Sequence, residues 1–155
     1  TFTVPANLSA MTAIAASSAV KTRTFDISNA MGHHGYPMND GMQMRHRING
    51  KLFDSSRIDE NISANTNEIW VFDNSKGDEP HPMHLHGVFF QVLGRSGGRG
   101  SLIASENGWK DTVLVMPGET VRVIVPFESN SGKFVFHCHN LEHEDDGMML
   151  QYQLS

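Results

Sequence analysis

The stretch HCHNLEHEDDGM, residues 137–148, is the densest group of potential metal ligands in this 155-residue sequence. It holds three histidines, the only cysteine of the chain and a methionine. Copper sites of the blue electron-transfer type use two histidines, one cysteine and a weak axial methionine. Cys138, His143 and Met148 supply three of these four ligands, so the fourth must come from another part of the chain.

A second histidine motif, HPMHLHG at residues 81–87, offers that fourth ligand. Side chains of a β-strand alternate between its two faces. If KFVFHCH is a strand, its cysteine points to one face, while His137 and His139 point to the other and cannot join the metal of the cysteine. Alternation also places His84 and His86 together on one face. Two such pairs of imidazoles facing each other would form half of a polynuclear metal site.

Together, HPMHLHG and HCHNLEHEDDGMM resemble the last cupredoxin domain of multicopper oxidases, the laccase and cuprous-oxidase family. The resemblance extends from about Thr22 to the C-terminus and includes GWKDTV at residues 108–113. It implies that copper is the cofactor and that Glu144 helps to bring protons to an oxygen-reducing copper cluster. The ligands that the resemblance implies are His81, Cys138, His143 and Met148 for a type 1 copper, His84 for a type 2 copper, and His86, His137 and His139 for type 3 copper.

The alternative interpretation is that these side chains are ordinary core or surface residues, since a buried free cysteine is common. Two separate motifs with matching spacing argue against it. Met149 is a competing candidate for the axial ligand, but strand alternation and the match to the family's Gly-Met pair favour Met148. Asp78 and Glu79 either orient the free ring nitrogen of His81 or are solvated loop charges.

The length is that of one domain, or of one domain and an arm. We expect an arm or interdomain linker over residues 1–20 and a cupredoxin domain over residues 21–155. The formal charge of −5 argues against a nucleic-acid partner, because such a surface needs a basic stripe. No apolar run approaches the roughly 20 residues of a membrane span. The single cysteine excludes an internal disulfide.

Turn signals between short alternating segments predict an all-β protein of about seven or eight strands, arranged as a cupredoxin-like Greek-key sandwich or barrel. The expected strands include an edge strand at 21–28, a strand at 67–74, a strand across 108–116 and a last edge strand at 148–155. Asn49-Gly50 and Pro117-Gly118 predict turns, and the glycine cluster at 94–100 predicts a hairpin loop. At most a short helical turn follows Cys138.

The segment from Asn29 to about His46 is rich in glycine, asparagine, methionine and histidine. Thioethers are soft ligands that would suit a docking surface for cuprous ions. The side chains available for it are Met31, Met38, Met42, Met44, His33 and His34. The simpler interpretation, which the irregular spacing favours, is a flexible loop whose methionines lie on apolar surface.

The resemblance implies an electron-transfer domain that takes electrons from a small reductant, a phenol-like molecule or a cuprous ion, at the type 1 copper. Cys138 and its flanking histidines would pass them to a trinuclear cluster that other cupredoxin domains, in the same or another chain, complete. The alternative is a stand-alone or truncated blue copper protein without oxidase activity, although such a carrier has no need of the four extra histidines. A third possibility is a purely structural zinc or copper site. By resemblance alone, the location is periplasmic or secreted.

Overall fold

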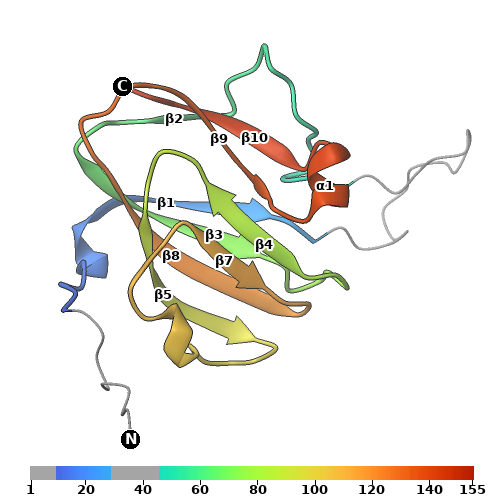
Figure 1. The fold of residues 1–155 in the computed structure, drawn as a ribbon, viewed down its shortest axis with the longest axis horizontal. Helices are drawn as coiled ribbons and strands as arrows, with labels where there is room; N and C mark the ends of the chain where they lie inside the picture. Colours follow the sequence, from blue (N-terminus) through green and yellow to red (C-terminus); the bar gives the residue numbers. More distant parts are fainter. Residues whose placement is uncertain (1–9, 29–45) are drawn as a thin grey trace, which may run out of the picture.

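Two five-stranded β-sheets form the body of the protein in the computed structural model, which describes residues 10–28 and 46–155 (Figure 1). The first sheet has the order β1 (Ala19–Asp26), β3 (Thr66–Asp73), β8 (Glu119–Phe127), β5 (Phe90–Gly97) and β6 (Trp109–Lys110). The second has the order β2 (Glu60–Ile62), β10 (Met149–Leu154), β9 (Gly132–Cys138), β4 (His81–Leu85) and β7 (Thr112–Val115). The short helical elements are η1 (Ala16–Ser18), η2 (Ala104–Glu106) and α1 (Leu141–Asp145). The predicted all-β fold is confirmed.

The core consists of the apolar faces of both sheets. Along β8, Val121, Val123 and Val125 are fully buried, as the alternation of a strand with one inward face requires. Trp70 on β3 is also fully buried, and its ring lies 4.8 Å from that of Phe25 and 4.9 Å from that of Phe136, centroid to centroid. These tilted and edge-on contacts are the geometry that aromatic pairs prefer. Because Phe136 belongs to β9, this cluster fixes the strand that carries the cysteine.

The prediction of an edge strand at the C-terminus is wrong, because β10 lies between β2 and β9. Its outer neighbour β2 pairs in parallel, with Tyr152 opposite Glu60 and Leu154 opposite Ile62. Because β2 and β10 are parallel and far apart in the sequence, no tight turn joins them, and the sequence carries no local signal of their pairing. The other expected edge strand is confirmed, since β1 lies at the edge of its sheet.

The segment 108–116, predicted as one strand, contains two strands, β6 and β7, that belong to different sheets. The break falls at Asp111, whose carbonyl accepts a hydrogen bond from the backbone of Leu85 (3.1 Å). The predicted loop at 94–100 is also shorter than expected, because β5 continues through Gly97. A Cβ atom at Gly97 would lie 2.0 Å from the carbonyl oxygen of Gly118, so the close approach of two backbones requires glycine there.

The Asn49-Gly50 turn is confirmed. Both residues have positive φ (53° and 71°), and an antiparallel bridge joins Ile48 to Lys51, as in a type I′ turn. The short helical turn after Cys138 is α1. The methionines and histidines of the proposed cuprous docking surface, Met31, Met38, Met42, Met44, His33 and His34, lie outside the described residues.

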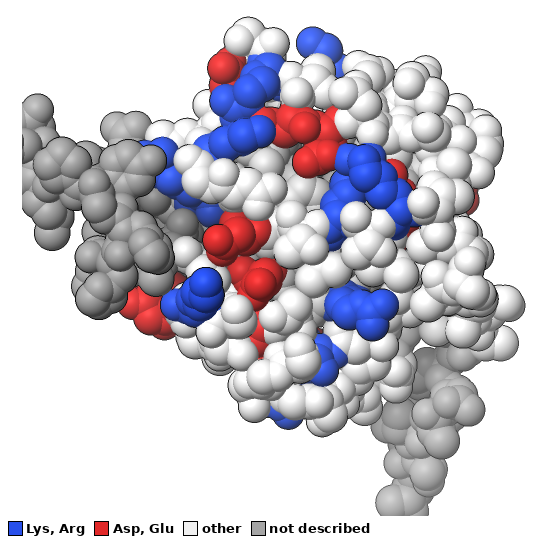
Figure 2. All heavy atoms as spheres, turned by 180° about the vertical axis from the view of Figure 1, so that it is seen from behind, with Lys and Arg blue, Asp and Glu red and all other residues white. Residues whose placement is uncertain are grey.

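Part of the expected N-terminal arm is hydrogen-bonded to the first sheet. The Gln91 side chain on β5 accepts from the backbone of Ile14 (2.8 Å) and donates to the carbonyl of Thr12 (2.9 Å). No helix among the described residues is long and apolar enough to cross a membrane. On the face seen in Figure 2, acidic and basic side chains are interspersed.

Candidate metal centre

Strand β4 begins, β9 ends and α1 follows at one end of the sandwich (Figure 1). His81, Cys138 and His143 come from these three elements and bring their ligand atoms together. The antiparallel pairing of β4 with β9 sets Met83 opposite Cys138, which brings the start of β4 beside the end of β9. His143 lies on α1, whose first turn is capped by the Asn140 side chain accepting from the backbone of Glu142 (3.3 Å).

The three ligand atoms of this group converge in a buried space. The two Nδ1 atoms of His81 and His143 lie 3.1 Å apart, and the Cys138 Sγ lies 3.6 Å and 3.5 Å from them. All three residues are buried. Two imidazole nitrogens and one sulfur aimed at a common point form a soft donor set that suits copper.

Burial sets the protonation state of this group. It lowers the pKa of His81 to about 4, with a further decrease from the neighbouring His143 and His46, and it lowers the pKa of His143 in the same way. Burial also raises the pKa of the Cys138 thiol to about 11. At neutral pH both imidazoles are therefore uncharged and have lone pairs to donate. The thiol must lose its proton when a metal binds.

Met148 is fully buried and belongs to the loop that closes over this group. Its backbone N–H donates to the carbonyl of His143 (2.9 Å), and its carbonyl accepts from the backbone of Cys138 (3.1 Å). In the β9–β10 ladder Met149 is directly opposite His137, so these two side chains share one face. Alternation then leaves Met148, and not Met149, on the face of Cys138.

Four other histidines gather on the opposite face of β9. His84 on β4 is directly opposite His137 on β9, and the Nε2 atoms of His86 and His137 lie 3.0 Å apart. The ring of His139 lies 5.5 Å from that of His84 and 5.3 Å from that of His137. His84, His86 and His137 each offer one nitrogen within 4.8 Å of the others. The exposed positions of His86 and His139 leave this group open to a partner surface.

Hydrogen bonds orient these rings. His84 Nδ1 lies 2.9 Å from the carbonyl oxygen of Asp111, and His137 Nδ1 lies 3.0 Å from the carbonyl oxygen of Cys138. In each ring Nδ1 therefore carries the proton, which leaves Nε2 as the possible ligand. Glu144 on α1 lies with this second group, its Oε2 3.4 Å from His137 Nδ1 and 4.0 Å from His139 Nδ1.

Sequence reasoning missed a third contact group, outside the first. His46 lies with its ring stacked on that of His143, at a centroid distance of 3.6 Å and an interplanar angle of 13°. Glu79 Oε2 lies 2.7 Å from His46 Nε2 and 3.3 Å from His143 Nε2. Of the two interpretations of Glu79, a hydrogen bond to the free ring nitrogen of His81 is not observed; the side chain is 43% exposed, and its carboxylate contacts His46 and His143 instead. No spacing signal connects His46 to the two histidine motifs.

The outward nitrogen of His81, Nε2, is buried and has no hydrogen-bond partner among the described residues. The hydrogen bond with His46 lowers the pKa of the Glu79 carboxyl, although burial opposes this effect, so Glu79 is ionised at neutral pH. The two histidines of the first group therefore differ in their surroundings.

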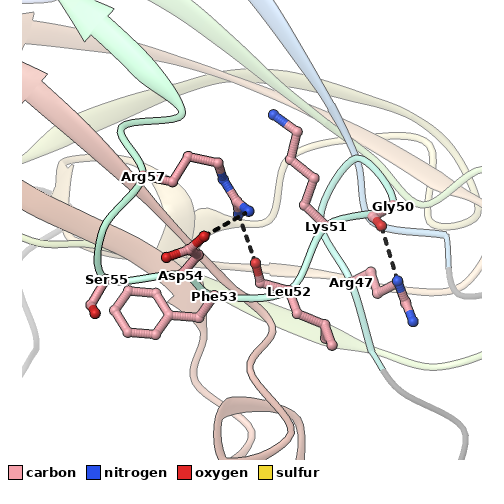
Figure 3. Close-up of a pocket in the computed structure, with 8 residues that line it drawn as sticks. All are labelled: Arg47, Gly50, Lys51, Leu52, Phe53, Asp54, Ser55 and Arg57. Atoms are coloured by element: carbon pink, nitrogen blue, oxygen red, sulfur yellow. Dashed lines mark hydrogen bonds and ion pairs between the residues drawn. The ribbon is translucent and has the colours of Figure 1, made fainter.

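A pocket of about 690 Å³ is lined by residues of the segment 47–57 (Figure 3) and by no residue of either histidine group. Its wall borders the Met148 loop because the backbone of Phe53 donates to the carbonyl of Gly147 (2.9 Å). The cations in it are largely neutralised: the buried Asp59 pairs with Arg57 (2.6 Å) and Lys51 (3.4 Å). The lining residues are Arg47, Gly50, Lys51, Leu52, Phe53, Asp54, Ser55 and Arg57.

A two-sheet sandwich with a buried His₂Cys group at one end defines a cupredoxin domain. The chain belongs to the multicopper oxidases, since the family model described as "Multicopper oxidase" matches residues 23–155. Copper is therefore its cofactor, as the donor set of the first group also indicates.

Several relatives share this sequence and fold. "Multicopper oxidase mco" of Staphylococcus aureus is 40% identical over 119 residues, which are 75% of this chain and 26% of that protein. A laccase of Haloferax volcanii is 44% identical over 108 residues, 69% of this chain and 18% of that protein. The crystal structure of a laccase from Pediococcus acidilactici matches with a TM-score of 0.81 at 35% identity, over 100% of this chain and 31% of that one. The chain thus spans less than a third of the length of each of these relatives.

Proposed function

We propose that this chain is the electron-accepting domain of a laccase-like multicopper oxidase, corresponding to the last cupredoxin domain of the family. His81, Cys138, His143 and Met148 would hold a type 1 copper. On the other face, His84 would serve a type 2 copper, and His86, His137 and His139 would serve type 3 copper. The observation that carries the proposal is the division of the two ligand groups between opposite faces of β9.

Copper, when bound, supplies one-electron transfer at the first group and oxygen reduction at the second. The chain itself supplies the connection between them. Cys138 is bonded through the backbone to His137 on one side and to His139 on the other, so a short covalent path joins the two groups. The sandwich also holds the first ligand set in place from three elements, β4, β9 and α1. A ligand set that moves little lowers the reorganisation needed for electron transfer.

Glu144 would act on the oxygen-reducing side. Its carboxylate lies within 4.0 Å of the Nδ1 atoms of both His137 and His139, and its side chain is 31% exposed. A group in contact with both the ligand rings and solvent is placed to carry protons inward.

Completion of the cluster requires other cupredoxin domains, in the same or another chain. His86 and His139 are exposed in this chain. This supports the proposal, because a partner domain that completes the cluster would cover them. The donor would be a small reductant, phenol-like or a cuprous ion; relatives are named laccase and, in Albifimbria verrucaria, bilirubin oxidase. A periplasmic or secreted location belongs to the same proposal.

Copper loading of the 155-residue chain tests the proposal. We expect an intense visible thiolate-to-copper band that Cys138→Ser abolishes and His137→Ala largely retains, because His137 lies on the opposite face of the strand. A coloured Cys138→Ser variant would overturn the ligand assignment. A colourless unsubstituted chain would indicate a purely structural metal site.

Oxygen uptake with a phenolic or cuprous donor separates an oxidase domain from a stand-alone carrier. We expect the isolated blue chain to accept electrons without turnover, and turnover to begin when the other cupredoxin domains are supplied. The four histidines behind β9 favour this outcome, since a simple carrier has no use for them. Failure to reduce oxygen in the completed assembly would support the stand-alone carrier.

A further inference from the structure

We propose that His46, acting with Glu79, is a positioning residue that holds His143 in the orientation and tautomer needed to bind copper. The inference rests on the proposed type 1 site and adds two residues that neither histidine motif contains. His46 lies just before the hairpin turn at Asn49-Gly50, and Glu79 lies in the loop before β4.

The stack between His46 and His143 is the first support. Two rings at 3.6 Å and 13° are in face-to-face contact, and both are largely buried, His46 with 13% and His143 with 6% of the side chain exposed. His143 cannot rotate about its Cβ–Cγ bond without losing this contact. The other ring nitrogen of His46, Nδ1, lies 3.6 Å from Asp146 Oδ2 at the end of α1 and makes no hydrogen bond among the described residues.

The shared carboxylate is the second support. Glu79 Oε2 lies 2.7 Å from His46 Nε2 and 3.3 Å from His143 Nε2. An ionised carboxylate only accepts hydrogen bonds, so His46 Nε2 carries the proton in its hydrogen bond to Glu79, and the negative charge 3.3 Å from His143 Nε2 favours the tautomer of His143 that is protonated there. The Nδ1 of His143 is then unprotonated, and it is the atom that faces Cys138 Sγ at 3.5 Å. A carboxylate behind a ligand histidine is a common device for fixing the ring and its tautomer.

Asn140 and Glu79 favour different tautomers of His143. Its Nδ2 also lies 3.3 Å from His143 Nε2, and an amide N–H can only donate to that nitrogen if the nitrogen is unprotonated. Without the carboxylate, Asn140 would favour the tautomer that has its proton on Nδ1, facing the metal. Loss of Glu79 is therefore expected both to remove a contact and to shift His143 toward the tautomer that is protonated on Nδ1. His81 has no corresponding partner among the described residues, so this control acts through His143.

The test uses the copper-loaded chain and five variants. Three are single substitutions at the proposed positions, Glu79→Gln, His46→Ala and His46→Phe; the fourth is the double variant His46→Phe/Glu79→Gln, and the fifth is a matched control, Asp145→Asn, at an exposed position of α1. Copper affinity is measured by competition with a chelator, together with the position of the thiolate-to-copper band and the reduction potential. Thermal unfolding of the metal-free proteins shows whether each variant folds. Glu79→Gln is expected to perturb folding less than either His46 variant, because 43% of the Glu79 side chain is exposed and only 13% of the His46 side chain.

We expect Glu79→Gln and His46→Ala each to weaken copper binding by roughly 10- to 100-fold, the usual effect of removing a group behind a metal ligand, and to shift the band and the potential. His46→Phe keeps a flat ring and should lose less affinity than His46→Ala. Asp145→Asn should stay within twofold of the unsubstituted chain. Because His46 and Glu79 are hydrogen-bonded to each other and contact the same ring, the copper affinity of the double variant His46→Phe/Glu79→Gln should fall by less than the product of the two single effects.

If the unsubstituted chain is blue, and Glu79→Gln and His46→Ala leave affinity, band and potential unchanged, the positioning role is refuted while the type 1 site stands. Equal losses for His46→Phe and His46→Ala would refute the stacking contribution. If the unsubstituted chain binds no copper with a thiolate band, the proposed function fails, and this inference fails with it.

Discussion

The substitution Glu119→Gln is expected to destabilise the fold by roughly 3 kcal/mol at neutral pH and by progressively less in acid. The Glu119 side chain is completely buried at the start of β8. Its carboxylate pairs with Arg95 and accepts from Arg99 Nε (2.7 Å) and from the backbone of Met116 (3.0 Å). Glutamine has one accepting oxygen and a donor amide, so it cannot satisfy this set.

The magnitude follows from the pKa of Glu119. Burial alone would raise this pKa, but hydrogen bonds from Arg99 and Met116 and the charge of Arg95 outweigh it and lower the pKa from 4.5 to about 2. Each pKa unit corresponds to about 1.4 kcal/mol, which gives roughly 3 kcal/mol for the ionised carboxylate. Because the folded-state pKa is the lower one, this stabilisation is fully present above pH 4.5 and is lost as the pH falls through about 2.

The assay is urea unfolding of the metal-free chain and the variant at about pH 7 and at about pH 3. Comparison of the two proteins at each pH cancels the effect of the other carboxylates. The control is Glu142→Gln, which changes an exposed carboxylate and should alter the free energy of unfolding little. If the difference in unfolding free energy between chain and variant is the same at both pH values, or near zero at neutral pH, the ionised Glu119 carboxylate does not stabilise the fold.

This network also supports the metal centre. Arg99 Nη2 donates to the carbonyl of Leu114 on β7 (3.0 Å), and β7 is the strand that pairs with β4. Arg99, which pairs with the buried Glu119, thus connects this network through β7 to β4, the strand that presents His81 and His84.

Two further changes follow from the packing. Trp70→Ala should lower the free energy of unfolding by about 3–5 kcal/mol, as loss of a fully buried aromatic side chain does. Trp109→Ala, which removes a half-exposed ring, should lower it much less in the same urea titration. Equal effects of the two substitutions would contradict the assignment of the core. Gly147→Ala places a side chain at φ 90°, which costs about 1–3 kcal/mol, and should displace Met148 enough to shift the visible band of the copper-loaded chain. An unchanged melting temperature and band would show that this turn does not set the position of Met148.

Strand alternation made the central part of the site predictable. The direction of the Cys138 side chain relative to His137 and His139 depends only on the period of two along β9, which is a local property of the sequence. The same holds for the alternating valines of β8 and for the turn at Asn49-Gly50, where the turn residues themselves determine the backbone.

Features that depend on contacts distant in the sequence were not predictable. The three-residue strand β2 has no pattern of its own and exists because β10 offers it a partner. The division of 109–115 between two sheets depends on where β4 and β5 lie. The approach of His46 to His143 depends on how the segment before β2 folds against α1, and a histidine in a loop carries no sign of that contact.

The most direct test of the central claim is a crystal structure of the copper-loaded chain, with copper located by its anomalous scattering. We expect one ion bound by the Nδ1 atoms of His81 and His143 and by the sulfur of Cys138, with His137 and His139 turned to the opposite face of β9. An ion that leaves Cys138 unligated, or that also binds His137 or His139, would contradict it.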